Sequence, residues 1–252
     1  SAVQLSTHRE VALKVLARAA FGGEKARSRF EREVELTARL QHPNIAQVHD
    51  SGIHHGVYYY AMELIEGMPL DRYVEEHHLT QREILELMRT VCQAVQHAHE
   101  RGVIHRDLKP SNILVSHGGQ PHILDFGLAK AFAGREPGLK VSMEGKPTGT
   151  PAYMSPEQAA GKLHEIDTRT DVYSLGVILF GLLTGESPHD LSGTRYEVLR
   201  RIAEEEVRRP REIARDIDHE LEAVLLKALA HNPKERYPSA GILAQDIQNY
   251  LT

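Results

Sequence analysis

The sequence HRDLKPSN, from His105 to Asn112, decides how this chain is interpreted, and Asp125-Phe126-Gly127 begins thirteen residues after Asn112. Asp107 and Asn112 are five residues apart on one polar loop, with Lys109 between them. A carboxylate placed beside an attacking hydroxyl can accept its proton, an amide oxygen can hold a metal ion, and an ammonium group can neutralise a transferring phosphoryl group. The alternative is a polar turn capped by Asn112, which the full octapeptide makes much the weaker interpretation.

Asp125 is the second candidate metal ligand, because Mg²⁺ is bound through hard oxygens, often one or two carboxylates together with phosphate oxygens. A lone Asp-Phe-Gly would be a common turn. Here it follows a predicted strand and stands close behind the octapeptide, which makes it specific. We expect Phe126 to be buried beneath the site and Gly127 to let the loop turn.

The composition is that of a globular protein of one large domain or two lobes. The 252 residues are 41% apolar and 26% charged, which argues against disorder, and the net charge of −5 gives no electrostatic reason to expect nucleic acid. Cys92 is the single cysteine and excludes an internal disulfide, so we expect a buried structural thiol and a reducing, cytoplasmic location. No stretch approaches the roughly 20 apolar residues of a membrane-spanning helix.

The hydrophobic patterns divide the chain into a small strand-rich part and a larger helical part. Before a boundary at Gly67 to Pro69 we expect strands at 11–16, 45–48 and 57–64, a turn at Ser51-Gly52 and an amphipathic helix at 24–40. Beyond it, Thr80 and Glu83 form a capping box for a helix that Gly102 ends. Further elements are short strands at 103–104, 113–115 and 122–124, a loop at 131–149, and helices at 171–184, 196–206, 220–230 and 240–251.

Lys14 lies inside the first predicted strand, where a charged side chain is costly unless it is paired or exposed. Glu33, on the following helix, can supply the partner. An exposed lysine is the ordinary interpretation of Lys14 alone, and the later motifs reverse it. The strand-rich part, the helical part and the motifs on loops between them predict an α+β protein with its chemistry at the junction.

From Val11 to Leu251 the chain resembles the catalytic domain of the bacterial-type (Hanks-type) Ser/Thr protein kinases. The motifs that carry the resemblance are VALK at 11–14, HRDLKPSN, DFG and TGTPAYMSPE at 148–157. It implies a bilobal fold, with the N-lobe and hinge at 1–66 and the C-lobe at 67–252. It also implies binding of ATP with Mg²⁺ or Mn²⁺ between the lobes, protein substrates and autophosphorylation. Homodimers occur in the family.

The resemblance assigns the nucleotide site. Lys14, oriented by Glu33, would hold the α- and β-phosphates. Met62 stands at the gatekeeper position, and backbone groups of Glu63 and Ile65 would bind the adenine edge. The two adenine faces would be covered by Ala12 and Leu114, although each of these hinge and pocket residues is equally compatible with ordinary core.

The resemblance also assigns the segment that precedes the large helical part. Thr150 would lie beside Asp107 and Lys109, and Ser155 stands where the family more commonly has Ala. In the family, the Arg before the catalytic Asp receives a phosphate that is carried on the activation segment. The alternative for the two candidate phosphosites, Ser142 and Thr148, is that both are merely solvated loop hydroxyls. The remaining implied residues are Arg106 as the phosphate receptor, Ser142 and Thr148 as phosphosites, Glu157 paired with Arg236, and Asp171 bonded to the backbone of the catalytic loop.

The departure from the family lies at the start of the chain. The family's Gly-x-Gly-x-x-Gly loop should precede VALK, but the first glycine here is Gly22. Because the amides of that loop cradle phosphates, we expect weaker ATP binding and a bare sheet edge. Either a longer chain supplies the loop, which the position of the last residue favours, or the natural protein lacks it. A pseudokinase or scaffold is the alternative function. A second departure is Thr37, where the family stacks an apolar residue, and we expect it to loosen that packing.

Overall fold

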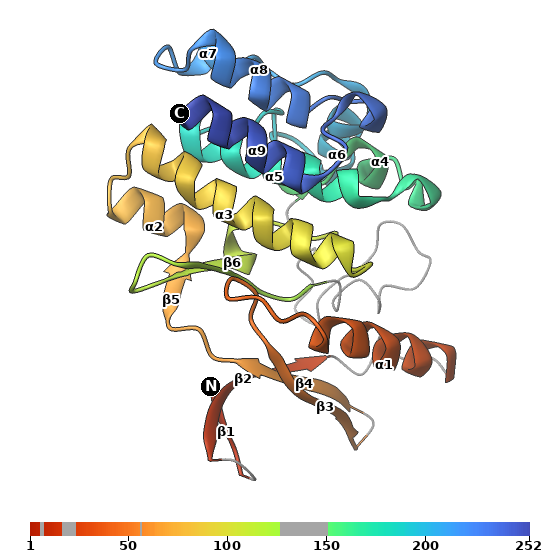
Figure 1. Cartoon of the computed structure of the whole chain (residues 1–252). Helices are drawn as coiled ribbons and strands as arrows, with labels where there is room; N and C mark the ends of the chain where they lie inside the picture. Colours follow the sequence, from red (N-terminus) through yellow and green to blue (C-terminus); the bar gives the residue numbers. More distant parts are fainter. Residues whose placement is uncertain (6–7, 17–23, 56, 127–150) are drawn as a thin grey trace.

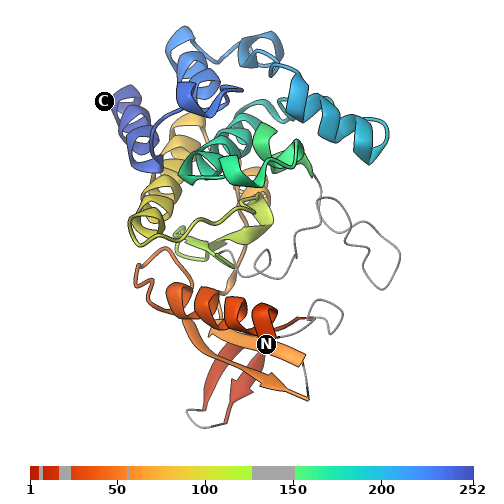
Figure 2. The ribbon, with the colours of Figure 1, turned by 90° about the vertical axis from the view of Figure 1, so that its right-hand side faces the viewer.

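The computed structural model describes residues 1–5, 8–16, 24–55, 57–126 and 151–252. Figure 1 shows a small antiparallel sheet with one helix beside it, and a larger group of helices on the other side of residues 64–66. Figure 2, turned by 90°, shows the same two layers, with the N-terminal strands and α1 gathered at one end. The predicted α+β architecture of a strand-rich and a helical lobe is confirmed.

The N-terminal sheet has the strand order β1-β2-β4-β3, and every pair is antiparallel. Lys14 on β2 lies opposite Tyr60 on β4, and Ala12 lies opposite Met62. Tyr60 and Met62 belong to the apolar cluster that includes Val34 of α1, so the helix covers this sheet on that side. The elements are β1 (Ala2–Gln4), β2 (Arg9–Leu16), α1 (Glu24–Ala38), β3 (Val48–His54) and β4 (Val57–Glu63).

The predicted turn at Ser51-Gly52 is wrong, because β3 runs through both residues and ends at His54. Gly52 lies opposite Tyr59 on β4. A Cβ atom at position 52 would lie 2.8 Å from the Tyr59 hydroxyl oxygen, so the aromatic side chain occupies the space that a larger residue would need. A glycine inside a strand often marks such a close approach, and here it does not end the strand.

A second, three-stranded sheet lies between the lobes, in the order β5-β6-β7 (Gly67–Pro69, Ile113–Ser116 and Pro121–Ile123). Gly67, the first residue of β5, lies so close to β6 that an added Cβ would overlap the carbonyl oxygen of Val115. The loop before β3 is bonded to β7, because the Ile123 N–H donates to the Asn44 carbonyl at 2.8 Å and the Ala46 N–H donates to the Ile123 carbonyl at 3.0 Å. The backbone thus joins the lobes on both sides of this sheet.

The predicted strand at 103–104 is wrong, and its backbone instead ends a helix. The Val103 N–H donates to the Ala98 carbonyl, and the Gly102 N–H donates to the His99 carbonyl, both at 3.0 Å. With φ of +74° at Gly102, this is a Schellman motif. Val103 is apolar because it packs into the core after that motif.

The helical lobe is built around α3, α5 and α9, which lie side by side in Figure 1. The capping box of Thr80 and Glu83 at the start of α3 is present as predicted, and Cys92 on that helix is fully buried. Burial raises the pKa of the Cys92 thiol to about 12, consistent with the predicted structural role. The helices are α2 (Leu70–Glu76), α3 (Gln81–Glu100), α4 (Pro156–Ala159), α5 (Thr168–Thr184), α6 (Arg195–Glu204), α7 (Pro210–Ile213), α8 (His219–Ala228) and α9 (Ala240–Leu251).

Helix α5 is apolar on nearly all sides, as its sequence predicts, and is buried from Thr170 to Phe180. It begins three residues earlier than predicted, because the Asp167 side chain accepts from the Arg169 N–H and caps it. Helices α2, α4 and α7 were not predicted. Within the described ranges, no helix is long and apolar enough to cross a membrane.

Candidate active site

The predicted catalytic loop brings Asp107, Lys109 and Asn112 together ahead of β6. The Lys109 ammonium group lies 3.1 Å from Oδ2 of Asp107. The Asn112 amide nitrogen donates to the Asp107 carbonyl at 2.8 Å, which turns the amide oxygen the other way. In the part of the chain that the structure describes, no group donates a hydrogen bond to that amide oxygen.

His105 ties the two sequence motifs together. One face of its buried ring is 4.8 Å, centroid to centroid, from the ring of Phe126. Its Nε2 lies 2.8 Å from the Leu124 carbonyl, which can only accept, and its Nδ1 lies 3.3 Å from the Asp107 N–H, which can only donate. The ring is therefore the Nε2–H tautomer. Burial lowers the pKa of His105 despite the neighbouring acids, so it is neutral at physiological pH.

Asp171 supports the catalytic loop from α5, as the resemblance implied. Its Oδ1 accepts from the Arg106 N–H and its Oδ2 from the His105 N–H, both at 2.8 Å. The sequence analysis missed His99, whose Nε2 lies 2.7 Å from the same Oδ2. Burial raises the pKa of Asp171, but the hydrogen bond and charge of His99, with His105, outweigh it and lower the pKa overall.

The Lys14 side chain forms an ion pair with Oδ2 of Asp125, and the predicted pairing of Lys14 with Glu33 is wrong in this structure. Glu33 is partly buried, and its carbonyl accepts from the Thr37 hydroxyl at 2.8 Å. The register of β2 on β4 places Lys14 opposite Tyr60, and both side chains contact Asp125 in the turn after β7. Only the tertiary arrangement brings that turn under the sheet.

Tyr60, which the sequence analysis did not single out, donates to the other oxygen of Asp125, Oδ1, at 2.6 Å. Burial raises the pKa of Tyr60 well above its usual value near 10, and the charge and hydrogen bond of Asp125 raise it further. The hydroxyl is therefore protonated and acts as the donor. Asp125 itself has φ of +59°, in the left-handed region.

The polar substitution at Thr37 makes a contact of its own. Besides the Glu33 carbonyl, its hydroxyl reaches the Phe126 carbonyl at 3.4 Å, and the residue is buried. A long hydrogen bond thus stands where the family stacks an apolar side chain. It connects α1 to the turn that carries Asp125.

The residues assigned to the adenine site lie on β2, β4 and β6 and in the linker between the lobes. Met62 is buried at the end of β4, and the Glu63 N–H donates to the Gln47 carbonyl at 2.8 Å. Ala12 on β2 and Leu114 on β6 are partly buried. The backbone groups of Ile65 make no hydrogen bond within the described ranges. Their contact with adenine stays a prediction.

Glu157 and Arg236 form the predicted ion pair. Two parallel bonds of 3.0 and 2.9 Å join the guanidinium to the carboxylate, and both side chains are buried. The Thr170 hydroxyl also donates to Glu157, at 2.7 Å. Burial raises the pKa of Glu157, but its bonds with Arg236 and Thr170 outweigh that and lower it overall. This pair anchors α4 on the helical lobe.

The Ser155 that replaces the family's commoner Ala caps α4. Its side chain accepts from the Gln158 N–H, and the Gln158 side chain reaches back to the Ser155 N–H, which makes a capping box. Gln158 also donates to the Arg106 carbonyl at 2.8 Å, so α4 holds the catalytic loop. The remaining predicted residues of this segment, Ser142, Thr148 and Thr150, lie outside the described residues, as does Gly127.

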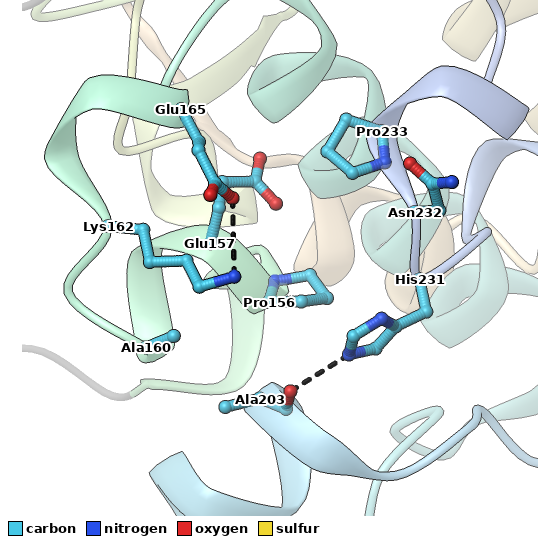
Figure 3. A pocket seen from close by; sticks show the side chains of 9 residues that line it. All are labelled: Pro156, Glu157, Ala160, Lys162, Glu165, Ala203, His231, Asn232 and Pro233. Carbon is cyan, nitrogen blue, oxygen red and sulfur yellow. Dashed lines mark hydrogen bonds and ion pairs between the residues drawn. The ribbon is translucent and has the colours of Figure 1, made fainter.

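Figure 3 shows a cavity of about 260 Å³ between α4, the end of α6 and the segment from His231 to Pro233. Its polar groups are paired with one another or with the chain. Lys162 pairs with Glu165 at 3.5 Å, and His231 bonds to the Ala203 carbonyl at 2.8 Å. Glu157 is held by Arg236. The lining is completed by Pro156, Ala160, Asn232 and Pro233.

The comparisons with known proteins agree with this geometry. The protein kinase domain family model matches residues 1–247. The serine/threonine-protein kinase PknB of Mycolicibacterium smegmatis is 38% identical over 96% of this chain, and PrkC of Bacillus subtilis is 34% identical over 95%. The chain spans 39% and 36% of these relatives. A Myxococcus xanthus relative, the tyrosine-protein kinase MasK, is 36% identical over 88% of the chain and is spanned to 35%.

Among solved structures, the kinase domain of Mycobacterium tuberculosis PknI is similar, with a TM-score of 0.73 and 29% identity over 96% of this chain and 86% of that one. The fold, the loop around Asp107 and the turn at Asp125 are those of a protein kinase domain with two lobes. The chain belongs to the protein kinase family, as a catalytic domain of the bacterial Ser/Thr type.

Proposed function

We propose that this domain transfers the γ-phosphoryl group of ATP to Ser or Thr hydroxyls of protein substrates. The observation that carries the proposal is the joining of the two motifs. The Leu124 N–H donates to the Asn112 carbonyl at 2.8 Å, so the residue before Asp125 is bonded to the residue that ends HRDLKPSN. His105 makes the second link, because it contacts the Leu124 carbonyl and the Asp107 N–H, so the backbone brings the loop of Asp107 and Asn112 next to the turn that carries Asp125.

The donor set fits a divalent cation. Asn112 offers its amide oxygen, because its amide nitrogen is engaged with the Asp107 carbonyl. Asp125 offers a carboxylate whose side chain is 7% exposed. Hard oxygens of these two kinds are the ligands that Mg²⁺ and Mn²⁺ take, together with phosphate oxygens. When bound there, the cation would neutralise charge on the phosphates of ATP.

The chain's own residues supply the rest of the proposed mechanism. Asp107 accepts or orients the proton of the attacking hydroxyl, and its carboxylate is held by Lys109. Lys109 then neutralises charge on the group in transfer. Lys14, which now contacts Asp125, is the cation that meets the α- and β-phosphates. The adenine edge binds the backbone at Glu63 and Ile65, between Ala12 and Leu114.

The proposed regulation of transfer involves Arg106 and a phosphate on the activation segment. Arg106 has φ of +64° and is tied to α4 through Gln158, so its backbone is fixed directly beside Asp107. We propose that its guanidinium receives a phosphate on Ser142 or Thr148 through charge-assisted hydrogen bonds. Phosphosite mapping after incubation with ATP, followed by Ser142→Ala and Thr148→Ala, tests this. Full activity in the double variant would reject it.

Transfer of labelled γ-phosphate tests the proposed function. The acceptors are the chain itself and three basic peptides identical except for Ser, Thr or Tyr at one position. Asp107→Asn is the control, because it keeps size and removes the carboxylate. We expect label on the Ser and Thr peptides and none with the Asp107→Asn variant. Label only on the Tyr peptide would reassign the specificity, and absence of transfer by the folded protein would leave a scaffold role instead.

A further inference from the structure

Tyr60 places a hydroxyl against a residue that we assign to the cation. Its oxygen lies 2.6 Å from Oδ1 of Asp125, and the side chain is 1% exposed. Oδ2 of the same carboxylate pairs with Lys14, directly across the sheet from Tyr60. Two adjacent strands of the N-terminal sheet therefore hold both oxygens of one carboxylate that belongs to the other lobe.

The hydroxyl does more than complete the apolar cluster around it. Tyr60 packs there with Val34, Val48 and Met62, where a phenylalanine ring would fill nearly the same space. Burying a hydroxyl without a hydrogen bond costs free energy, so a tyrosine suits this cluster only because Asp125 accepts from it. The ring of Tyr60 packs in the apolar cluster, and its hydroxyl donates a hydrogen bond to Asp125 in the turn.

Asp125 has a backbone conformation that requires support. Its φ of +59° is in the left-handed region, which is sparsely populated by residues other than glycine, although Asp tolerates it. Such conformations persist where the surroundings over-determine them. The Tyr60 and Lys14 contacts act on the side chain of this residue. Neither contact exhausts the carboxylate, because each oxygen has two acceptor positions.

We propose that Tyr60 is a positioning residue for the proposed cation site, where its hydroxyl sets the orientation of the Asp125 carboxylate. The inference rests on the proposed function, since it assumes that Asp125 meets nucleotide-bound Mg²⁺. Outer hydrogen-bond partners of metal-ligating carboxylates orient them, and losing such a partner typically costs about 10- to 100-fold in metal affinity or activity. Loss of the Tyr60 hydroxyl should therefore weaken the cation-dependent part of nucleotide binding.

The test compares Tyr60→Phe with Tyr59→Phe, its neighbour on the same strand. Tyr59 lies over Gly52, away from Asp125, so its hydroxyl is a matched control. Calorimetry measures ADP affinity with Mg²⁺ and with EDTA, and the ratio of the two gives the gain due to the cation. We expect about a 10-fold smaller gain for Tyr60→Phe, unchanged affinity in EDTA, and the wild-type ratio for Tyr59→Phe. The Mg²⁺ concentration for half-maximal transfer should rise while the KM for peptide stays constant.

A cycle with Asp125→Asn separates positioning from packing. If Tyr60 acts through the carboxylate, Tyr60→Phe should add little to the loss caused by Asp125→Asn, whereas fully additive losses would overturn the inference. An equal or larger cation-dependent gain in Tyr60→Phe would also overturn it, the larger gain meaning that the hydroxyl competes with the cation. A wild-type protein that shows neither transfer nor cation-dependent ADP binding would reject the proposed function together with the inference.

Discussion

His99 and Asp171 form a buried pair beneath the catalytic loop, with His99 Nε2 2.7 Å from Oδ2 of Asp171 and both side chains at most 3% exposed. The same carboxylate accepts the backbone N–H groups of His105 and Arg106. One aspartate on α5 therefore couples the end of α3 to the backbone that positions Asp107. The pair has a structural and a catalytic consequence, and both can be measured.

Replacing His99 by Phe should lower both stability and turnover. The phenyl ring fills the site but leaves Oδ2 of Asp171 without its side-chain donor, which should cost about 1–3 kcal/mol in the free energy of unfolding. Turnover should fall because His99 no longer holds the Asp171 carboxylate, which positions the backbone of the catalytic loop. Urea denaturation and initial rates check the two effects. The exposed neighbour substitution Glu100→Gln is the control and should change neither.

Acid unfolding should respond to the same substitution. The pKa of Asp171 is lowered in the folded state, so its contribution to stability is fully present above the unfolded pKa near 3.9 and is lost as pH falls through the folded pKa. Without His99 the folded pKa rises, and the loss should begin at higher pH. Circular dichroism between pH 6 and 2 measures this. An unchanged acid midpoint in His99→Phe would mean that His99 does not stabilise the carboxylate.

His189 should make the protein less stable between about pH 6.5 and 4. Burial lowers its pKa to about 4, helped by His231 and Arg208, and it lies 2.8 Å from the Tyr173 hydroxyl. The unfolded chain then takes up the proton first, so stability is full above pH about 6.5 and falls with pH by up to about 1.4 kcal/mol per unit.

His189→Gln should remove that share of the slope, because glutamine can bond to Tyr173 and does not titrate. His164→Gln is the matched control, since the His164 side chain is 82% exposed. Urea midpoints at pH 7.5, 6 and 5 supply the comparison. Equal slopes in wild type and His189→Gln would contradict the assignment of the lowered pKa.

The buried Glu157–Arg236 pair should be costly to break. Arg236→Gln leaves the Glu157 carboxylate buried without its bidentate partner, and losing one member of a buried pair typically costs about 3–5 kcal/mol. The exposed pair of Lys162 and Glu165 in Figure 3 provides the contrast, because Lys162→Gln should cost less than about 1 kcal/mol. Thermal melts measure both. Similar losses in the two variants would show that burial does not set the energy of these pairs.

Gly67→Ala should destabilise the junction between the lobes. Its Cβ would overlap the Val115 carbonyl oxygen, and backbone cannot move aside as a flexible side chain can. Gly118→Ala, on the turn after β6, is the matched control, because its Cβ would meet nothing closer than the Ser116 side chain at 3.9 Å. We expect a loss above about 1 kcal/mol for the first and near zero for the second. Chemical denaturation of both variants is sufficient.

The motifs of this chain were predictable because they are local. HRDLKPSN and DFG fix residue types and spacing over 23 positions, and the antiparallel strands β6 and β7 between them bring Asn112 and Leu124 side by side. The capping box at Thr80 and the buried helix α5 are local in the same sense. Each rests on interactions within about one helical turn or on the burial of a whole face.

The partners of Lys14 and the role of Tyr60 were not predictable, because they depend on strand register and on the placement of one lobe over the other. Three tyrosines stand together at 58–60, and period-two alternation separates their faces without saying which hydroxyl meets an acid. His99 lies among apolar residues at helical spacing, so its sequence context indicates core. The sequence predicts a turn at Gly52 because glycine is typical of turns. Its actual neighbour, Tyr59, is seven residues away in sequence and lies directly opposite on β4.

The close approach at Gly67 determines where the two lobes can pivot. At Gly67 the backbone of β5 contacts the backbone of β6 directly, with no side chain between them that could rearrange. The start of β5 therefore moves as a rigid body with the helical lobe. Any swing of the N-terminal sheet must then be taken up by the dihedral angles of Leu64, Ile65 and Glu66 and by the loop before β3, which is bonded to β7. Ile65 is itself a proposed adenine contact and Leu64 follows the other, Glu63, so a change in the opening angle of the domain would also move the backbone that binds adenine.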